Sequence, residues 1–205
     1  MGIFDLSHHI NQKMPIYPGD KPVILYKDAT LTKEGYETYF VSGNLHVGTH
    51  LDVPRHIIED SRFVSYFEID RFIGRAILLD VRGQLEIDYK EEYEVLINYG
   101  DIIVLYTGYD KYYGESVYFD EHPVITKAFV DFMISKKIKL LGMDMPSPDY
   151  APYERHQELL GADICLLENL TNLECLVGID NIELYAVPLK LDAEASPVRA
   201  FARLL

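Results

Sequence analysis

The stretch His46-Val-Gly-Thr-His-Leu-Asp-Val-Pro-Arg-His56 concentrates metal-binding side chains in one short segment. His46, His50, Asp52 and His56 stand at even offsets from one another. In an extended segment all four side chains therefore point to the same side, because successive side chains alternate. A helix turns by about 100° per residue, so it would carry Asp52 and His56 away from the face that His46 and His50 share.

A straight strand does not gather these side chains either, because His46 and His56 would then lie about 33 Å apart. Gly48 and Pro54 stand inside the stretch and permit a sharp bend or a rigid turn. Imidazole and carboxylate groups gathered in this way suit a borderline divalent cation, zinc first and manganese second. Histidines that only cap turns are the alternative, and the density of ligand-type residues favours the metal site.

The composition of the 205 residues bounds the class of protein. An apolar fraction of 48% is enough for a full core, most simply in one domain over residues 1–205. The net charge of −14 argues against binding to nucleic acid or to an anionic membrane. No apolar run approaches the ~20 residues that span a membrane, and no signal peptide is visible. The sequence thus predicts a soluble, cytoplasmic protein.

Four other residues with reactive side chains are expected to have structural roles. Cys165 and Cys175 are too few for a disulfide framework, and their apolar neighbours predict core packing. His8 and His9 stand beside a serine without a spaced carboxylate, so we expect them to be polar loop residues.

Apolar runs of strand length alternate with helix-like segments along the middle of the chain. Strands are expected at residues 75–81, 101–108, 139–144 and 163–168, and helices at 88–98, 126–137 and 154–160. Thr126 is the expected N-cap of the second helix. Further strands are expected at 3–6, 38–45, 181–191 and 196–203, with an edge or a bulge at Pro188. This order predicts a mixed α/β fold.

A catalytic metal site needs residues beyond the first stretch. His46, His50 and Asp52 could fill three positions around an ion and leave a fourth open. His156, on the last predicted helix, and Glu168, at the polar end of a buried strand, are further candidates. The chain has no HExxH motif, phosphate loop, nucleophile elbow or dinucleotide fingerprint.

Tyr17 lies in a segment, residues 14–20, with two prolines and a glycine, which excludes regular structure. A rigid loop that carries an aromatic ring could form the wall of a pocket. It could equally be a surface turn with Tyr17 packed inward, and the residues alone leave both interpretations open.

The pattern His-x-Gly-Thr-His-x-Asp-x-Pro-x-His resembles the signature of the cyclase-like metal-dependent hydrolases, which include bacterial kynurenine formamidase and isatin hydrolase. Further segments resemble this family in the same order along nearly the whole chain. They are residues 17–20, 106–112, 142–149, His156 with 168–172, and 188–190 with 196–200. The resemblance implies a single-domain swivelling β/β/α fold of the cyclase type.

The resemblance also implies a binuclear centre, normally with two zinc ions per chain. His46, His50 and Asp52 would hold the first ion, and Asp52 and Glu168 would bridge to a second ion that His156 also holds. A homodimer or a higher homo-oligomer is implied as well.

Two further roles follow from the same resemblance. His56 would carry protons rather than bind metal, because a neutral imidazole can pass a proton to a departing amine near pH 7. Tyr17 would lie against the aryl ring of the substrate, where kynurenine formamidase has a tryptophan. Thr49 and Asp144 are candidates for orienting the ligand imidazoles.

The implied function is a metal-dependent amidohydrolase that activates water at its metal centre. The first small-molecule substrate to consider is N-formylkynurenine, or a similar aryl formamide, in tryptophan catabolism. Another aryl or cyclic amide, such as an isatin-like lactam, is the alternative within enzymes. A non-catalytic metal-binding protein and a structural zinc site are the alternatives outside them. Tyr17, Met145 and the glycine-free segment 191–197 depart from the family pattern, which leaves the substrate rather than the reaction type in question.

Overall fold

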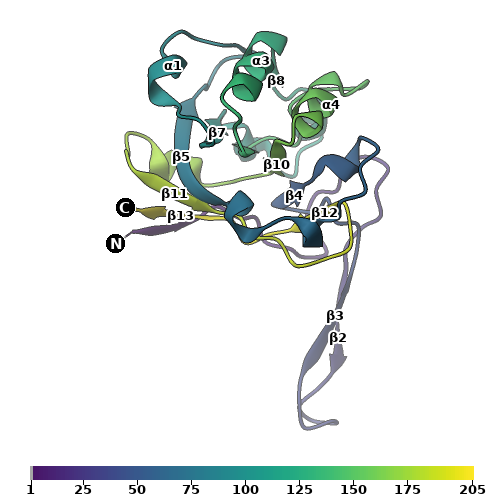
Figure 1. The fold of residues 1–205 in the computed structure, drawn as a ribbon. Helices are drawn as coiled ribbons and strands as arrows, with labels where there is room; N and C mark the ends of the chain where they lie inside the picture. Colours follow the sequence, from purple (N-terminus) through teal and green to yellow (C-terminus); the bar gives the residue numbers. More distant parts are fainter. Residues whose placement is uncertain (1) are drawn as a thin grey trace.

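Nine strands form one sheet in the order β1-β13-β11-β5-β7-β9-β10-β4-β12, in a computed structural model that describes residues 2–205 (Figure 1). The four central strands pair in parallel; they are β5 (Ile73–Asp80), β7 (Ile102–Tyr106), β9 (Leu140–Met143) and β10 (Cys165–Glu168). The outer strands pair antiparallel; they are β1 (Ile3–Asp5), β13 (Phe201–Leu204) and β11 (Ile182–Tyr185) on one side, and β4 (His50–Asp52) and β12 (Ala195–Pro197) on the other.

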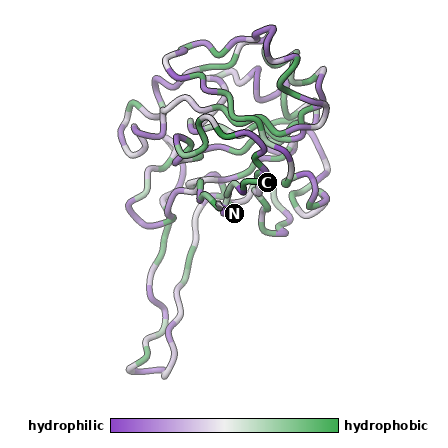
Figure 2. Tube along the Cα trace, turned by 90° about the vertical axis from the view of Figure 1, so that its left-hand side faces the viewer, coloured by the Kyte–Doolittle hydropathy of each residue, from purple (hydrophilic) through white to green (hydrophobic). Residues whose placement is uncertain are grey.

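Three of the central strands, β7, β9 and β10, are buried on both faces. Ile103 and Leu105 of β7 lie in a core cluster with side chains of α3 (Lys127–Ser135) and α4 (Glu154–Gly161). Ile102 and Val104 point the other way, into a second cluster with side chains of the outer strands. Figure 2 shows these strands as a hydrophobic layer inside the body of the molecule. Parallel strands buried on both faces require such continuous apolar runs.

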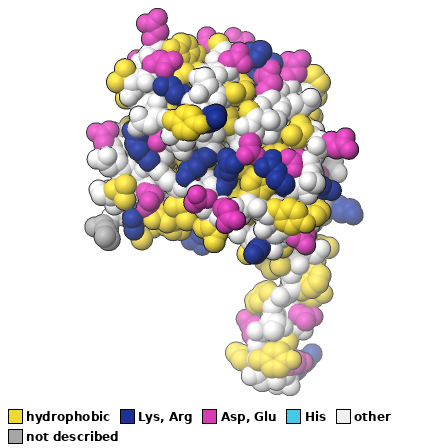
Figure 3. Space-filling model, viewed as in Figure 1, with side chains coloured by type: hydrophobic (Ala, Val, Ile, Leu, Met, Phe, Trp, Pro, Cys, Tyr) yellow, Lys and Arg dark blue, Asp and Glu magenta, His cyan; other side chains and the backbone are white. Residues whose placement is uncertain are grey.

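A separate hairpin of β2 (Ile24–Ala29) and β3 (Thr38–Ser42) projects from this body. Its two strands pair only with each other. Much of its apolar surface is exposed, including Tyr39 and Val41, and hydrophobic side chains line its visible face (Figure 3). The strand expected at 38–45 is therefore confirmed in part, because it ends at Ser42, and its partner β2 was not predicted.

Most of the predicted elements of the central layer are confirmed to within a few residues. Thr126 caps α3, because its hydroxyl accepts a hydrogen bond from the Phe129 amide. Cys165 is fully buried in the core, and Cys175 packs against it. The remaining short elements are α2 (Val117–Asp120) and the 3-10 helices Pro54–His56, Val64–Tyr66, Ile69–Phe72, Tyr109–Tyr112 and Leu173–Leu176. Within residues 2–205, no helix has the length and apolar character needed to cross a membrane.

The helix expected at 88–98 is wrong over its first half, since only α1 (Tyr93–Leu96) forms. The preceding residues of β6 (Glu86–Ile87) pair in parallel with β8 (Val124–Ile125) and hold the chain extended. Asp88 then accepts a hydrogen bond from the Thr126 hydroxyl. These tertiary contacts outweigh a weak local helical preference.

The two C-terminal strands expected at 181–191 and 196–203 are also corrected. β11 ends at Tyr185, and Pro188 takes part only in an isolated bridge with Val198, as its missing N–H requires. The last predicted strand is two strands, because β12 pairs with β4 at one edge of the sheet and β13 pairs with β11 near the other. The chain must leave one edge before it joins the other.

Candidate metal centre

The stretch 46–56 bends at the two predicted positions. Gly48 has a φ of +60°, in the left-handed region that favours glycine. β4 follows as a strand of only three residues, and Pro54 then begins the 3-10 helix that ends at His56. The bends bring the imidazoles of His46 and His56 to a centroid distance of 4.3 Å, where a straight strand would separate them widely.

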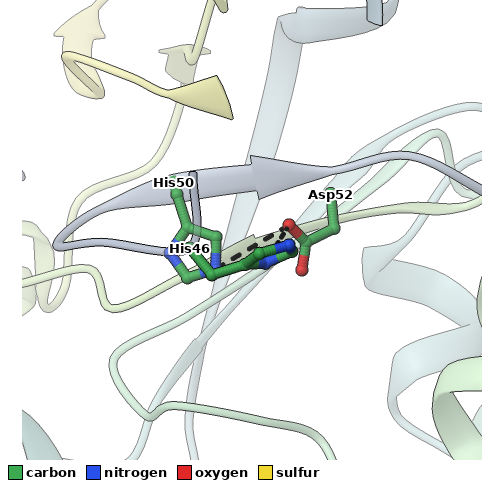
Figure 4. A group of neighbouring side chains, drawn as sticks. All are labelled: His46, His50 and Asp52. Carbon is green, nitrogen blue, oxygen red and sulfur yellow. Dashed lines mark ion pairs between the residues drawn. The ribbon is translucent and has the colours of Figure 1, made fainter. Parts of the chain in front are cut away.

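His46, His50 and Asp52 form the first half of the site. The Nδ1 atom of His46 lies 3.0 Å from Oδ1 of Asp52, and Nε2 of His50 lies 3.7 Å from the same oxygen. One donor atom from each residue lies within 4.8 Å of the other two. Figure 4 shows these side chains pointing toward one another beside β4. The arrangement fits a single ion held by two imidazoles and one carboxylate.

Glu168 and His156 form the second half. Glu168 is the last residue of β10 and lies opposite His50 in the register of β10 with β4. Its Oε2 lies 3.4 Å from Nε2 of His50, and its Oε1 lies 3.4 Å from Nε2 of His156, on α4. The Glu168 carboxylate therefore connects the two halves.

The second ring nitrogen of each of these three histidines faces an oxygen acceptor. The pairs are His46 Nε2 with Glu194 Oε1 (3.4 Å), His50 Nδ1 with the Gly48 carbonyl (2.8 Å), and His156 Nδ1 with Asp149 Oδ1 (2.6 Å). A carbonyl oxygen only accepts, so Nδ1 of a neutral His50 carries the proton and the Nε2 lone pair faces the centre. Such outer partners orient the imidazoles that hold a metal ion.

The prediction that Thr49 and Asp144 orient these imidazoles is wrong. The Thr49 hydroxyl donates to the Asn169 carbonyl, and Asp144 accepts hydrogen bonds from Thr107 and Gly108. Among the hydrogen bonds of residues 2–205, neither side chain reaches a ligand imidazole.

Three residues of the site were missed by the sequence analysis: Asp149, Glu194 and Asn169. Asp149 and Glu194 lie in irregular segments, where no periodic spacing relates them to a ligand. Asn169 directly follows Glu168, and this adjacency was the only available signal. Its Nδ2 donates to the Gly48 carbonyl (3.0 Å), while its Oδ1 accepts from the Tyr118 hydroxyl (2.8 Å).

Several atoms that could bind a metal ion lie at the centre of the site and have no hydrogen-bond partner. They are Nε2 of His50, both carboxylate oxygens of Asp52 and Oε1 of Glu168, all of them buried. Buried polar atoms are normally hydrogen-bonded, and unpaired buried charges are costly. A divalent cation would satisfy all four atoms at once, so the residues present fit a metal ion.

The charged groups of the site also favour a bound metal ion. Burial lowers the pKa of His46, but the carboxylates of Asp52, Glu194 and Glu168 together outweigh burial and raise it to about 11. Burial likewise opposes a rise at His156, where Asp149 and Glu168 raise the pKa to about 10. The buried carboxylates thus attract positive charge strongly, whether as protons or as a metal ion.

His56 differs from the three histidines that are candidate metal ligands. Burial lowers its pKa, and the opposing effect of Asp52 is too small to reverse this. Its ring centroid lies 6.2 Å from that of His156. Within the described part of the chain, its imidazole makes no hydrogen bond or ion pair. A neutral imidazole without an orienting partner is available to exchange protons.

A cavity of about 390 Å³ opens onto these residues. Its walls carry the aromatic rings of Tyr17, Tyr113, Phe119 and Tyr153. Tyr17 meets Phe119 edge to face, and its hydroxyl lies 3.1 Å from that of Tyr153. Of the two interpretations of Tyr17, the structure therefore supports the pocket wall.

The family model described as "Putative cyclase" matches residues 4–150. The kynurenine formamidase of Bacillus cytotoxicus is 30% identical to the chain, over 97% of this chain and 96% of its own length.

Two solved structures share the fold. Isatin hydrolase A from Labrenzia aggregata superposes with a TM-score of 0.87 at 22% identity, over 99% of this chain and 93% of its own. A potential metal-dependent hydrolase with cyclase activity superposes with a TM-score of 0.77 at 20% identity, over 98% of both chains. These likenesses confirm the mixed α/β fold of the cyclase type.

Proposed function

The chain belongs to the cyclase family of metal-dependent hydrolases, and we propose that it hydrolyses a small amide, with an aryl formamide such as N-formylkynurenine as the first candidate. One observation carries the proposal: buried ligand-type atoms that make no hydrogen bond and the neutral imidazole of His56 lie together in the wall of an aromatic cavity. The kynurenine formamidase relative supports the choice of substrate class.

Five residues would hold the metal. His46, His50 and Asp52 would bind one ion, and Glu168 and His156 would bind a second ion, with Asp52 and Glu168 shared between the two. Zinc suits this mixture of nitrogen and oxygen ligands, and manganese is the alternative. When bound, such ions lower the pKa of coordinated water and polarise a carbonyl group.

His56 would move the protons of the reaction. Hydrolysis of an amide requires a proton for the departing amine, and a neutral imidazole can accept a proton from water and then deliver it. The low pKa of His56 leaves its ring neutral near pH 7. A protein that only stores metal has no use for such a non-ligating imidazole.

The aromatic wall would position the substrate. Tyr17 and Phe119 present an edge-to-face pair to the cavity, and the contact with Tyr153 fixes the Tyr17 hydroxyl. An aryl ring held against these side chains would place its amide over the ligand cluster. The same wall would exclude water from the non-reacting side of the substrate.

Metal removal and replacement test the proposal. Protein stripped with a chelator is expected to lose turnover of N-formylkynurenine and formanilide, and to regain it when zinc or manganese is added. A protein that rebinds metal but hydrolyses no member of a panel of formamides and lactams would contradict amide hydrolysis.

One observation favours a second candidate, a cyclic aryl amide such as isatin. Among the described residues, no lysine or arginine lines the cavity, so the carboxylate of N-formylkynurenine has no cationic partner there. Isatin carries no charge and therefore needs no cationic partner. The ratio of kcat/KM on the two compounds separates these candidates.

A further inference from the structure

Asp20 lies in the wall of the cavity, beside the aromatic rings and outside the ligand cluster. Its backbone N–H donates to the Tyr17 carbonyl at 3.0 Å, which closes the turn Tyr17-Pro-Gly-Asp20. Pro18 is common at the first central position of a type II turn, and Gly19, with a φ of +98°, supplies the positive φ that the second central position requires. This rigid turn fixes the position of Asp20 relative to Tyr17.

The carboxylate of Asp20 has no cationic partner within residues 2–205. It takes part in no side-chain hydrogen bond or ion pair there, although Lys21 is its neighbour in the chain. The cavity lining contains acidic but no basic side chains, apart from its histidines. The wall near Tyr17 is therefore negatively charged. Burial and the contact with Tyr153 are the main causes that raise the pKa of the Tyr17 hydroxyl, and the Glu168 and Asp20 carboxylates raise it further.

We propose that Asp20 is a specificity-determining residue that binds a positively charged nitrogen on the substrate, and that the preferred substrates are aryl amides with an ammonium group and no free carboxylate. This inference rests on the proposed amide hydrolysis. An ammonium group against Asp20 forms a partly desolvated ion pair, and it also gains from the neighbouring aromatic faces. A substrate carboxylate at the same place meets a like charge.

N-formylkynurenine satisfies only part of this requirement. Its ammonium group can meet Asp20, but its carboxylate then has to lie toward the mouth of the cavity. The decarboxylated analogue, which keeps the formamide and the ammonium group, should therefore be the better substrate.

Three matched formanilides test the inference on the metal-loaded protein: one unsubstituted, one with an aminoethyl group and one with a carboxyethyl group. We expect kcat/KM to fall in the order cationic, neutral, anionic, by roughly tenfold at each step and mainly through KM. The preference for the cation should shrink as the salt concentration rises. Similar kcat/KM values for all three would overturn the role of Asp20 and leave amide hydrolysis standing. If none of the three is hydrolysed, the proposed hydrolysis of aryl formamides itself fails.

Substitution of Asp20 tests the assignment to this residue. Asp20→Asn should lower the ratio of cationic to neutral kcat/KM about tenfold, and Asp20→Lys should reverse the order of the cationic and anionic substrates. Asp180→Asn, which changes an exposed carboxylate on the body of the protein, is the matched control and should leave these ratios unchanged. If the ratio is unchanged in both Asp20 variants, another residue determines the preference for the cationic substrate and the inference about Asp20 is wrong.

Discussion

The Nδ1 atom of His156 lies 2.6 Å from Oδ1 of Asp149, seven residues earlier in the chain. The other oxygen of Asp149 accepts the backbone N–H of Arg155 at 2.7 Å, in the first turn of α4. One buried carboxylate therefore fixes both the start of this helix and the rotation of the imidazole that it carries. Nε2 of His156 is left to face Glu168.

Asp149→Asn should weaken metal binding by about 10- to 100-fold, because the amide is a poorer acceptor for the imidazole N–H. Competition with a chromogenic chelator measures the affinity. Asp180→Asn, which changes an exposed carboxylate on the body, is the control. Comparison of the metal-free proteins by thermal unfolding separates an effect on binding from one on folding. Unchanged affinity in a folded Asp149→Asn protein would show that this carboxylate does not support the site.

Tyr118→Phe should destabilise the protein by about 1–3 kcal/mol, because it leaves the buried Oδ1 of Asn169 without a donor. At roughly 2–4 °C per kcal/mol for a chain of this size, the shift in Tm is readily measured. Tyr66→Phe removes an exposed hydroxyl from the body of the protein and should leave Tm unchanged. If both variants unfold at the wild-type temperature, the bond from Tyr118 contributes nothing.

Stability at mildly acidic pH should depend on His8. Burial lowers the pKa of this imidazole to about 4, and its ring stacks on Tyr113 at a centroid distance of 3.6 Å. The unfolded chain, with a histidine pKa of about 6.5, binds the proton first, so this contribution to stability is lost as the pH falls from about 6.5 to 4.

His8→Phe keeps an aromatic ring and removes the titrating group. Denaturant unfolding of metal-free protein at pH 7 and pH 5 should therefore show a smaller loss of stability in the variant than in the wild type. The other titrating groups are common to both proteins, so the difference isolates His8. An equal loss in both would contradict the shifted pKa.

The hairpin of β2 and β3 is the surface through which we expect the predicted homo-oligomer to form. An isolated two-stranded hairpin is only marginally stable, and this one exposes a row of apolar side chains. Replacing Tyr39 and Val41 together with serine and threonine should lower the mass measured by sedimentation. The same kind of change at Leu85 and Val95, which are exposed on the body, is the control. A wild-type protein that sediments as a monomer would contradict the expectation.

The part of the site within residues 46–56 could be predicted from the sequence, because residues close together in the chain form it. Even spacing and two bend-forming residues gather His46, His50, Asp52 and His56 within eleven residues of chain. Glu168 reaches the site through the register of β10 with β4, which no local pattern specifies. Its place at the polar end of a buried strand made it a candidate, and the family resemblance gave it a role.

The features that could not be predicted from the sequence also depend on tertiary contacts. Asp149 and Glu194 act from irregular segments, where position depends on the tertiary fold rather than on periodicity. The helix expected from residue 88 fails because a pairing of short strands and the bond from Thr126 to Asp88 compete with it. The hairpin pairs residues of the N-terminal region that carry no clear alternation of burial.

His56→Ala tests the central division of roles most directly, when amide turnover and bound metal are measured on the same preparation. His9→Ala, an exposed histidine outside the site, is the control. We predict that the His56 variant loses at least about 100-fold in kcat while its metal content equals that of the wild type. Full activity in this variant, or loss of metal together with activity, would contradict the account.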